Sequence, residues 1–232
     1  MLARIKLAAL AGAVALVLGC TGPFLPVRFL PRGGTGDGLH RVLTNRVDAA
    51  YLKPGARFAG YDALLIDPVR VSYKTEPPPR GSVALSPDAV ERMKRIFRQC
   101  FDRELVESGD FGLAPEPGPS VLRISGRIVN LVVDAIPDRV GEGYQVNDTG
   151  EMTLALDVRD SVTGEPLVRV VDRRAIRPAG AGLGVLYQSS NVRNWGAMED
   201  VFCDWASILR EGLDELRELS EVPELPELPA PN

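Results

Sequence analysis

Apolar positions recur at the spacing of an α-helix in two separate segments of the chain. Between Val90 and Leu105 an apolar side chain follows every three or four residues, which places these side chains on one helical face. Ser86 precedes the segment, and a serine side chain can accept a hydrogen bond from the free N–H groups of a first helical turn. The pattern predicts an amphipathic helix that begins after Ser86 and ends near Gly109, and a second one over about residues 195–219.

Alternation of apolar and polar positions predicts strands in other parts of the chain. Pro68, inside the first of these parts, marks an edge or a bulge because proline cannot donate to a strand ladder. The turn-forming residues Ser161–Glu165 separate the last two parts and predict a hairpin. Four strands are predicted, over residues 62–73, 121–133, 151–160 and 167–174.

These elements together predict an α+β fold. A single, mainly antiparallel sheet of about four strands can bury its apolar face if both amphipathic helices pack on that face. A segment of this size buries most of its apolar surface in one core, so we expect a single domain.

The first 20 residues have the organisation of a bacterial lipoprotein signal. Arg4 and Lys6 precede the apolar run Leu7–Leu18, which is too short to span a bilayer and is typical of a signal peptide. The run ends in Val17-Leu18-Gly19-Cys20, which resembles the lipobox at which a diacylglyceryl group is attached to the cysteine thiol. We therefore expect residues 1–19 to be removed and Cys20 to carry an acyl anchor such as palmitate.

The rest of the chain divides by composition. Residues 20–50 are rich in proline and glycine, and we expect them to be a spacer after the lipid-bearing Cys20. Residues 51–219 would form the α+β domain, and residues 220–232, which repeat Pro-Glu-Leu, a tail without fixed structure. Thr21 follows the cysteine in place of the aspartate associated with inner-membrane retention, which predicts the outer membrane, facing the periplasm.

Charge narrows the range of partners. The chain has a formal net charge of −4, with 25% charged and 45% hydrophobic residues. An acidic chain does not provide the basic surface that nucleic-acid binding needs, so we expect no nucleic-acid partner. The same charge argues against electrostatic docking on anionic lipid. Membrane attachment is therefore expected through the lipid on Cys20, with an envelope protein as a further candidate partner.

Candidate chemistry is sparse. His40 is the single histidine and lies in the expected spacer, so we predict no catalytic triad, no histidine-based metal site and no cofactor. Cys100 and Cys203 remain after Cys20 is lipidated, an even pair in an oxidising compartment. Each lies beside the apolar stripe of one predicted helix. They form either a disulfide or two separate buried thiols, because spacing does not give the distance between their Cα atoms.

Residues 51–216 resemble a family of bacterial lipoproteins known as DUF3313, a domain of unknown function. The resemblance is carried by five short segments in the same order and spacing: Tyr51-Leu52-Lys53-Pro54-Gly55, Tyr61-Asp62-Ala63-Leu64-Leu65-Ile66-Asp67-Pro68-Val69, Asp160-Ser161-Val162-Thr163-Gly164-Glu165, Val171-Asp172-Arg173-Arg174, and Trp195-Gly196 with Asp204-Trp205-Ala206. It implies a lipoprotein with a small α+β domain. It brings no reaction, ligand or catalytic residue.

Three functions are compatible with these observations. The first is a non-enzymatic envelope lipoprotein that acts as an accessory or protein-interaction module. The second is a carrier of a small molecule or lipid in the periplasm, which requires a sizeable apolar cavity between sheet and helices. The third is an envelope hydrolase, which requires two acidic groups that converge in a cleft. The expectation at this point is that the protein is not an enzyme.

Overall fold

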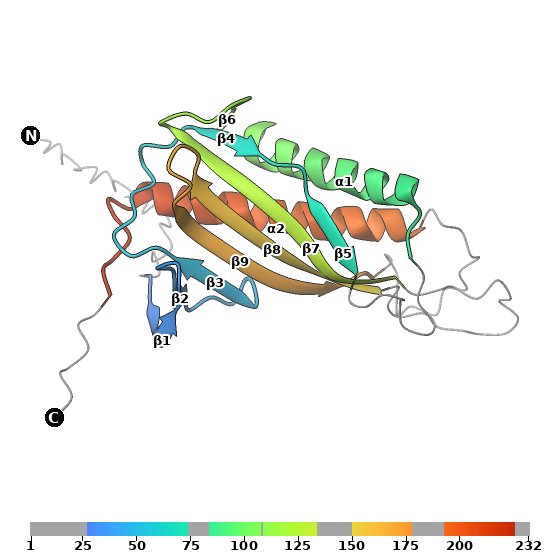
Figure 1. Ribbon diagram of the computed structural model, residues 1–232, viewed down its shortest axis with the longest axis horizontal. Helices are drawn as coiled ribbons and strands as arrows, with labels where there is room; N and C mark the ends of the chain where they lie inside the picture. The colour runs from blue at the N-terminus through green and yellow to red at the C-terminus, as the bar shows by residue number, and fades with distance from the viewer. Residues whose placement is uncertain (1–26, 74–83, 108, 134–149, 178–192, 226–232) are drawn as a thin grey trace, which may run out of the picture.

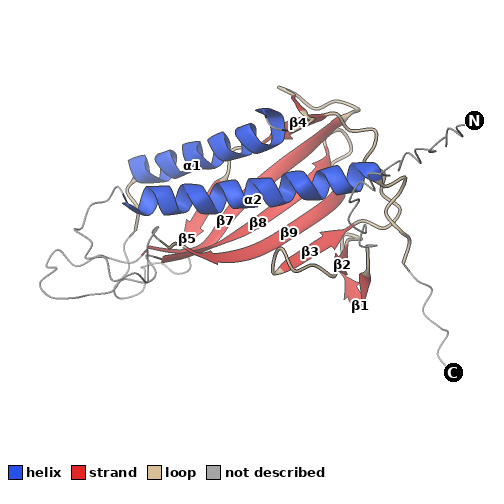
Figure 2. Ribbon diagram, turned by 180° about the vertical axis from the view of Figure 1, so that it is seen from behind, coloured by secondary structure: helices blue, strands red, loops and turns tan. Residues whose placement is uncertain are grey.

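One large sheet covered on one face by two helices forms the body of the protein. The computed structural model describes residues 27–73, 84–107, 109–133, 150–177 and 193–225. Within these ranges, nine strands join in one sheet, and both α1 and α2 lie on the same side of it (Figures 1 and 2). The architecture is α+β.

Three long antiparallel strands form the centre of the sheet. They are β7 (Val121–Val133), β8 (Gly150–Asp160) and β9 (Pro166–Ala175), and they pair in that order. Apolar side chains recur at every second position, as in β8, where Met152, Leu154, Leu156 and Val158 are buried in the core. These strands and the hairpin between β8 and β9 agree with the elements predicted from the alternation.

A parallel section flanks β7. The predicted strand over residues 62–73 is two strands, β4 (Ala63–Ile66) and β5 (Arg70–Tyr73), separated around Pro68, and both pair with β7 in parallel. The two-residue β6 (Gly112–Leu113) pairs with β4, also in parallel. Parallel neighbours need a crossover connection, and α1 lies in the segment that joins β5 to β7.

The opposite edge of the sheet comes from the segment expected to be a spacer. There, β1 (Phe29–Gly34), β2 (His40–Val42) and β3 (Ala49–Leu52) pair in succession, and β3 joins the antiparallel edge of β9. The expectation of a spacer is therefore wrong from residue 29 onward. Residues 20–26 of that segment lie outside the described residues, as do the signal peptide, Cys20 and the last part of the tail.

The predicted sheet of about four mainly antiparallel strands is therefore wrong. The sheet is mixed and has nine strands in the described part of the chain. The missed strands are two to six residues long, so their alternation is too brief to register. They are held mainly by pairing of their backbones to longer neighbours, which local sequence does not encode.

The two helices bury their apolar faces against the sheet. They are α1 (Pro87–Asp102), which continues as the π-helical turn η1 (Arg103–Glu107), and α2 (Arg193–Glu218). The Ser86 side chain accepts a hydrogen bond from the backbone N–H of Ala89 at 3.2 Å, which confirms the predicted helix start.

Aromatic side chains fill the contact between the helices. The Phe97 ring stacks on Phe101, with 4.0 Å between centroids, and meets the ring of Phe202 edge-on at 5.5 Å. A Cβ atom at Gly126 of β7 would lie 2.9 Å from the Phe97 ring, so glycine is what lets this ring lie directly on the sheet.

A buried carboxylate connects α2, β9 and the loop before β3. Asp172 is 3% exposed and accepts hydrogen bonds from Trp205 Nε1 at 2.8 Å, Arg174 Nε at 2.6 Å and the backbone N–H of Asp48 at 3.0 Å. Its charge is buried but fully partnered, which is the condition under which a buried ion is tolerated. Asp48 in turn accepts from the backbone N–H of Arg173 at 3.0 Å.

The substitution Asp172→Ala is expected to lower the free energy of unfolding by about 3 kcal/mol, because three donors lose a charged acceptor. Urea unfolding followed by circular dichroism measures the loss. Asp204→Ala is the matched control, since Asp204 contacts the same Arg174 at 3.9 Å from an exposed position. That control should change stability by less than about 0.5 kcal/mol. Equal losses in the two variants would contradict the role of Asp172.

Candidate functional site

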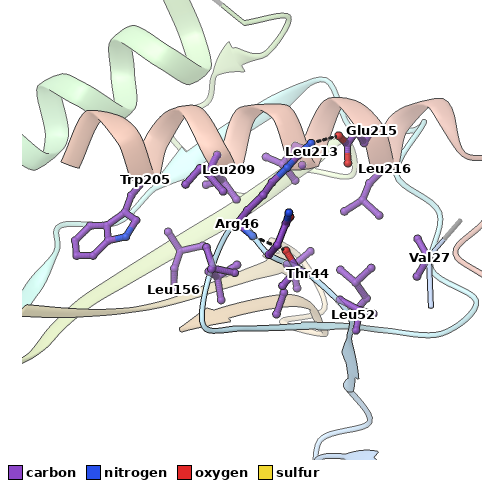
Figure 3. Close-up of a pocket in the computed structure, with 18 of the residues that line it drawn as sticks. Val27, Thr44, Arg46, Leu52, Leu156, Trp205, Leu209, Leu213, Glu215 and Leu216 are labelled. Carbon is purple, nitrogen blue, oxygen red and sulfur yellow. Dashed lines mark hydrogen bonds and ion pairs between the residues drawn. The ribbon is translucent and has the colours of Figure 1, made fainter. Parts of the chain in front are cut away.

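An apolar cavity of about 450 Å³ lies between α2 and the sheet. Its floor comes from β3, β8 and β9, its roof from the second half of α2, and its side from the six residues Leu43–Asp48 that connect β2 to β3, here called the rim loop (Figure 3). The apolar lining residues are Val27, Val42, Leu43, Val47, Ala50, Leu52, Leu154, Leu156, Val168, Val170, Trp205, Ile208, Leu209, Leu213, Leu216 and Leu219.

The cavity exists because the wall of α2 loses bulk where the helix passes over β8 and β9. Trp205 fills the space at one end, and its indole is fixed by Asp172. Two turns later the helix has a glycine, Gly212, which lines the cavity. A Cβ atom placed on it would meet nothing within 4 Å. Glycine inside a helix costs about 1 kcal/mol relative to alanine, so helix stability does not explain the glycine at position 212.

An ion pair crosses the mouth of the cavity. Arg46 of the rim loop donates from Nη2 to Oε1 of Glu215 on α2 at 2.7 Å (Figure 3). Its Nη1 lies 3.7 Å from Oε2 of Glu211. All three side chains are between 42% and 51% exposed, so the pair lies at the surface while the wall behind it is buried. It connects the rim loop directly to the helix that roofs the cavity.

The residues that sequence analysis selected lie elsewhere or outside the described residues. Cys20 is outside them. His40 is in β2, where its ring packs edge-on against Phe29 with 6.3 Å between centroids. Within the described ranges no group of three or more His, Cys, Asp or Glu side chains could hold a metal ion. No helix in those ranges is both long and apolar enough to cross a membrane.

The sequence pattern did not show which residues line the cavity. The amphipathic helix predicted over about residues 195–219 was expected to bury its apolar face, and Trp205, Leu209, Leu213 and Leu216 of that face line the cavity. Burial in a packed core and lining of an apolar cavity leave the same hydrophobic pattern. The sequence feature that could have indicated a cavity was Gly212, a glycine next to the apolar positions of this helix.

Two carboxyl groups with shifted pKa values lie away from the cavity and stabilise the sheet. Burial raises the pKa of Asp67, but hydrogen bonds from Arg123 and Ser125 and the charges of two arginines outweigh it, so the net pKa is lowered. Burial also raises the pKa of Asp160, and the N–H groups of the β8–β9 turn and the Tyr61 hydroxyl reverse the effect. A lowered pKa keeps both groups ionised, whereas a general acid needs a raised one.

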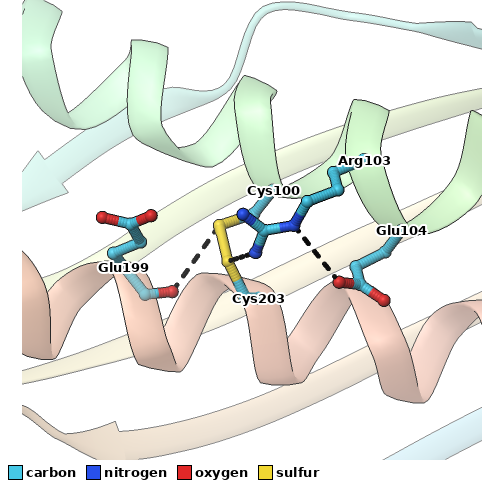
Figure 4. Close-up of a disulfide and its surroundings, with 5 residues drawn as sticks. All are labelled: Cys100, Arg103, Glu104, Glu199 and Cys203. Atoms are coloured by element: carbon cyan, nitrogen blue, oxygen red, sulfur yellow. Dashed lines mark hydrogen bonds and ion pairs between the residues drawn. A yellow bond between two sulfur atoms is a disulfide. The ribbon is translucent and has the colours of Figure 1, made fainter. Parts of the chain in front are cut away.

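Cys100 and Cys203 are joined by a disulfide that ties α1 to α2. Their Cα atoms are 4.8 Å apart, and 103 positions separate them in the sequence. Arg103 Nη2 donates to Sγ of Cys203 at 2.8 Å, while Sγ of Cys100 lies 3.6 Å from the backbone oxygen of Glu199 (Figure 4). The bond fixes the first half of α2 to α1, on the far side of Trp205 from the cavity.

Loss of this bond is expected to lower the free energy of unfolding by about 4 kcal/mol, since a loop of roughly 100 residues is no longer closed in the unfolded chain. The comparison is urea unfolding of the Cys100→Ala/Cys203→Ala variant and of the parent, both with Cys20→Ser so that a third thiol cannot interfere. Dithiothreitol should lower the midpoint of the parent and leave that of the variant unchanged. Two reactive thiols in denatured parent protein without reductant would contradict the prediction.

Several solved bacterial proteins match the fold with low similarity. They include a PelC dodecamer from Paraburkholderia phytofirmans, with 14% identity and a TM-score of 0.36 over 69% of this chain and 96% of that one. A homologue of a neuraminyllactose-binding hemagglutinin from Helicobacter pylori has 10% identity and a TM-score of 0.37 over 71% and 91%. A candidate lipoprotein from Caulobacter crescentus has 10% identity and a TM-score of 0.31 over 62% and 86%. These scores are too low to support an argument about this chain.

Family membership rests on the sequence. No curated protein matches the chain at a significant level. The model of one family, described as a protein of unknown function (DUF3313), matches residues 37–209. That range contains all five segments on which the resemblance was based, from Tyr51 to Ala206, and it begins well before residue 51, in agreement with the strands found there. The chain belongs to the DUF3313 family.

Proposed function

We propose that this protein is a lipid-anchored envelope protein that binds a small apolar molecule in the cavity between α2 and the sheet. The cavity carries this proposal. Protein interiors leave few voids larger than a water molecule, whereas pockets for small molecules measure about 300–1,000 Å³ and are mainly apolar. A space of about 450 Å³ walled by sixteen apolar residues belongs to the second class.

The physical cost of the cavity supports the same conclusion. An unfilled apolar void destabilises a fold in proportion to its volume, because the atoms that line it lose contacts. Gly212 adds to that cost, since a larger side chain there would both favour the helix and fill the space. A retained void is understood if a ligand occupies it, because a ligand bound only by the folded state stabilises that state.

The anchor would place the cavity close to the membrane. Cys20 is the predicted lipid acceptor, and Val27, seven positions later, already lines the cavity. Seven residues span at most about 25 Å when fully extended. A carrier that exchanges an apolar molecule with a bilayer needs such proximity, whereas the long spacer first expected would have allowed the domain to stay far away.

The rival functions lack a comparable observation. A non-enzymatic accessory or protein-interaction module also fits a lipid-anchored envelope protein, and the family has no known reaction. It does not explain why the space under Gly212 is open. An envelope hydrolase needs converging acidic groups, and the two carboxylates at the cavity mouth, Glu211 and Glu215, are instead both within 3.7 Å of the same arginine, Arg46.

Filling the cavity should abolish binding without loss of stability. In Gly212→Leu a leucine side chain projects into the space, and we expect affinity for the uncharged fluorophore N-phenyl-1-naphthylamine to fall at least tenfold, measured by fluorescence titration. The full chain with Cys20→Ser serves as parent, so that no attached acyl chain competes. The free energy of unfolding should stay equal or rise by up to about 1 kcal/mol, because glycine disfavours helices.

Gly196→Leu is the matched control for this experiment. Gly196 also lies in α2 and also has open space around a Cβ atom, but it is exposed and does not line the cavity. The control should bind the fluorophore as the parent does, which accounts for binding elsewhere on the chain. Equal binding by Gly212→Leu and the parent would refute the proposed function.

The anchor has a separate test. In cells that express the wild-type chain, the protein should fractionate with membranes, and [³H]palmitate should label it. Cys20→Ala removes the acceptor thiol, so label should be lost and the protein should no longer sediment as a lipid-anchored form. Palmitate label that persists in Cys20→Ala would contradict the anchor.

A further inference from the structure

We propose that the cavity selects amphiphiles with an uncharged or cationic head group and discriminates against anionic ones such as fatty acids. This inference rests on the proposed function and deepens it. It concerns the charges at the mouth, which decide what kind of polar group can remain there while an apolar chain lies inside.

The cavity offers no internal partner for a charge. Of the residues that line it, only Arg46 and Glu215 are ionisable, and they neutralise each other at 2.7 Å. The other polar lining residues, Thr44 and Asn45, belong to the rim loop. A charged head group would lose its hydration deeper in the cavity without compensation, so the head group must stay at the mouth.

The mouth has an excess of negative charge. Glu211 lies beside the Arg46–Glu215 pair, at 3.7 Å from Arg46 Nη1, so one guanidinium faces two carboxylates. Two arginines near the rim loop have partners other than these glutamates in the described part of the chain: Arg210 pairs with Asp214 at 3.5 Å, and Arg41 donates to the backbone oxygen of Asp48 at 2.9 Å. The three charges at the mouth therefore sum to −1.

This arrangement gives the mouth a different affinity for head groups of different charge. A carboxylate at the mouth would lie next to Glu211 and Glu215 and would compete with both of them for the charge of Arg46. A hydroxyl group can donate to either glutamate without breaking the existing pair, and an ammonium group can do so with opposite charge. Two like charges about 4 Å apart in water repel by about 1 kcal/mol, which corresponds to roughly a fivefold weaker affinity.

The test compares three probes with the same twelve-carbon chain: 1-monolauroylglycerol, dodecyltrimethylammonium and laurate. Each displaces N-phenyl-1-naphthylamine from the full chain with Cys20→Ser, below its critical micelle concentration and at low salt. We expect the neutral and cationic probes to displace the fluorophore at concentrations about fivefold lower than laurate. Raising the ionic strength should reduce the difference, because the charges at the mouth are exposed.

Charge variants at the mouth should shift the ratio of laurate affinity to monolauroylglycerol affinity in opposite directions. Glu211→Gln/Glu215→Gln leaves Arg46 unpaired and should raise this ratio at least fivefold. Arg46→Gln leaves two carboxylates uncompensated and should lower it. Glu199→Gln/Asp200→Asn removes two charges from the other end of the same helix and controls for overall charge.

The outcomes separate the two proposals. If the parent binds laurate as tightly as monolauroylglycerol or more tightly, and Arg46→Gln removes that affinity, then Arg46 is an anion receptor and the head-group selection is overturned while the cavity remains a binding site. If none of the probes binds and the fluorophore binds parent and Gly212→Leu alike, the proposed function itself fails.

Discussion

The distance at which α2 is held from the sheet determines whether there is a cavity at all. At one end, Trp205 fills the gap, and its indole N–H is fixed to the buried carboxylate of Asp172 on β9. The same carboxylate holds the backbone of Asp48, so the rim loop and the helix are positioned by one charged group. Beyond Trp205 the helix continues over β8 and β9 at that distance, with only aliphatic side chains and Gly212 beneath it. Asp172 thus connects the helix, β9 and the rim loop at the end of the cavity that Trp205 closes.

Sequence patterns were sufficient for the long elements of the fold and insufficient for its edges. The helix after Ser86 and the strand Val121–Val133 were predicted with nearly their observed bounds, because each has several periods of an apolar pattern and a recognisable start. The short strands over residues 29–52 are three to six residues long, and they join the sheet through the pairing of β3 with the distant strand β9. The parallel pairing of β4 and β5 with β7 depends on where α1 returns the chain, which is a tertiary property. For the same reason a lining residue such as Leu213 could be predicted as buried but not assigned to a cavity.

The two faces of the sheet differ in polarity. The face under the helices contains the core and the cavity, whereas the opposite face presents charged pairs between neighbouring strands, such as Arg169 with Asp157 and Arg173 with Glu151. This division is typical of a sheet with one solvated face. It confines apolar binding capacity to the helical side, where access is through the mouth between the rim loop and α2. Among the described residues, the charged groups at this mouth are Arg46 and its two carboxylates.

The pairing of β3 with β9 has a consequence for the order in which the protein can fold. Ala49 lies opposite Val171, so the first strands of the described chain acquire their partner only after about 120 further residues are available. The rim loop and the floor next to β3 cannot be completed before β9 is available, and such distant pairings are slow to form. A chain that crosses a membrane from its N-terminus would thus emerge with its binding region incomplete. The cavity is complete only when the final third of the sequence, which supplies β9 and α2, is available.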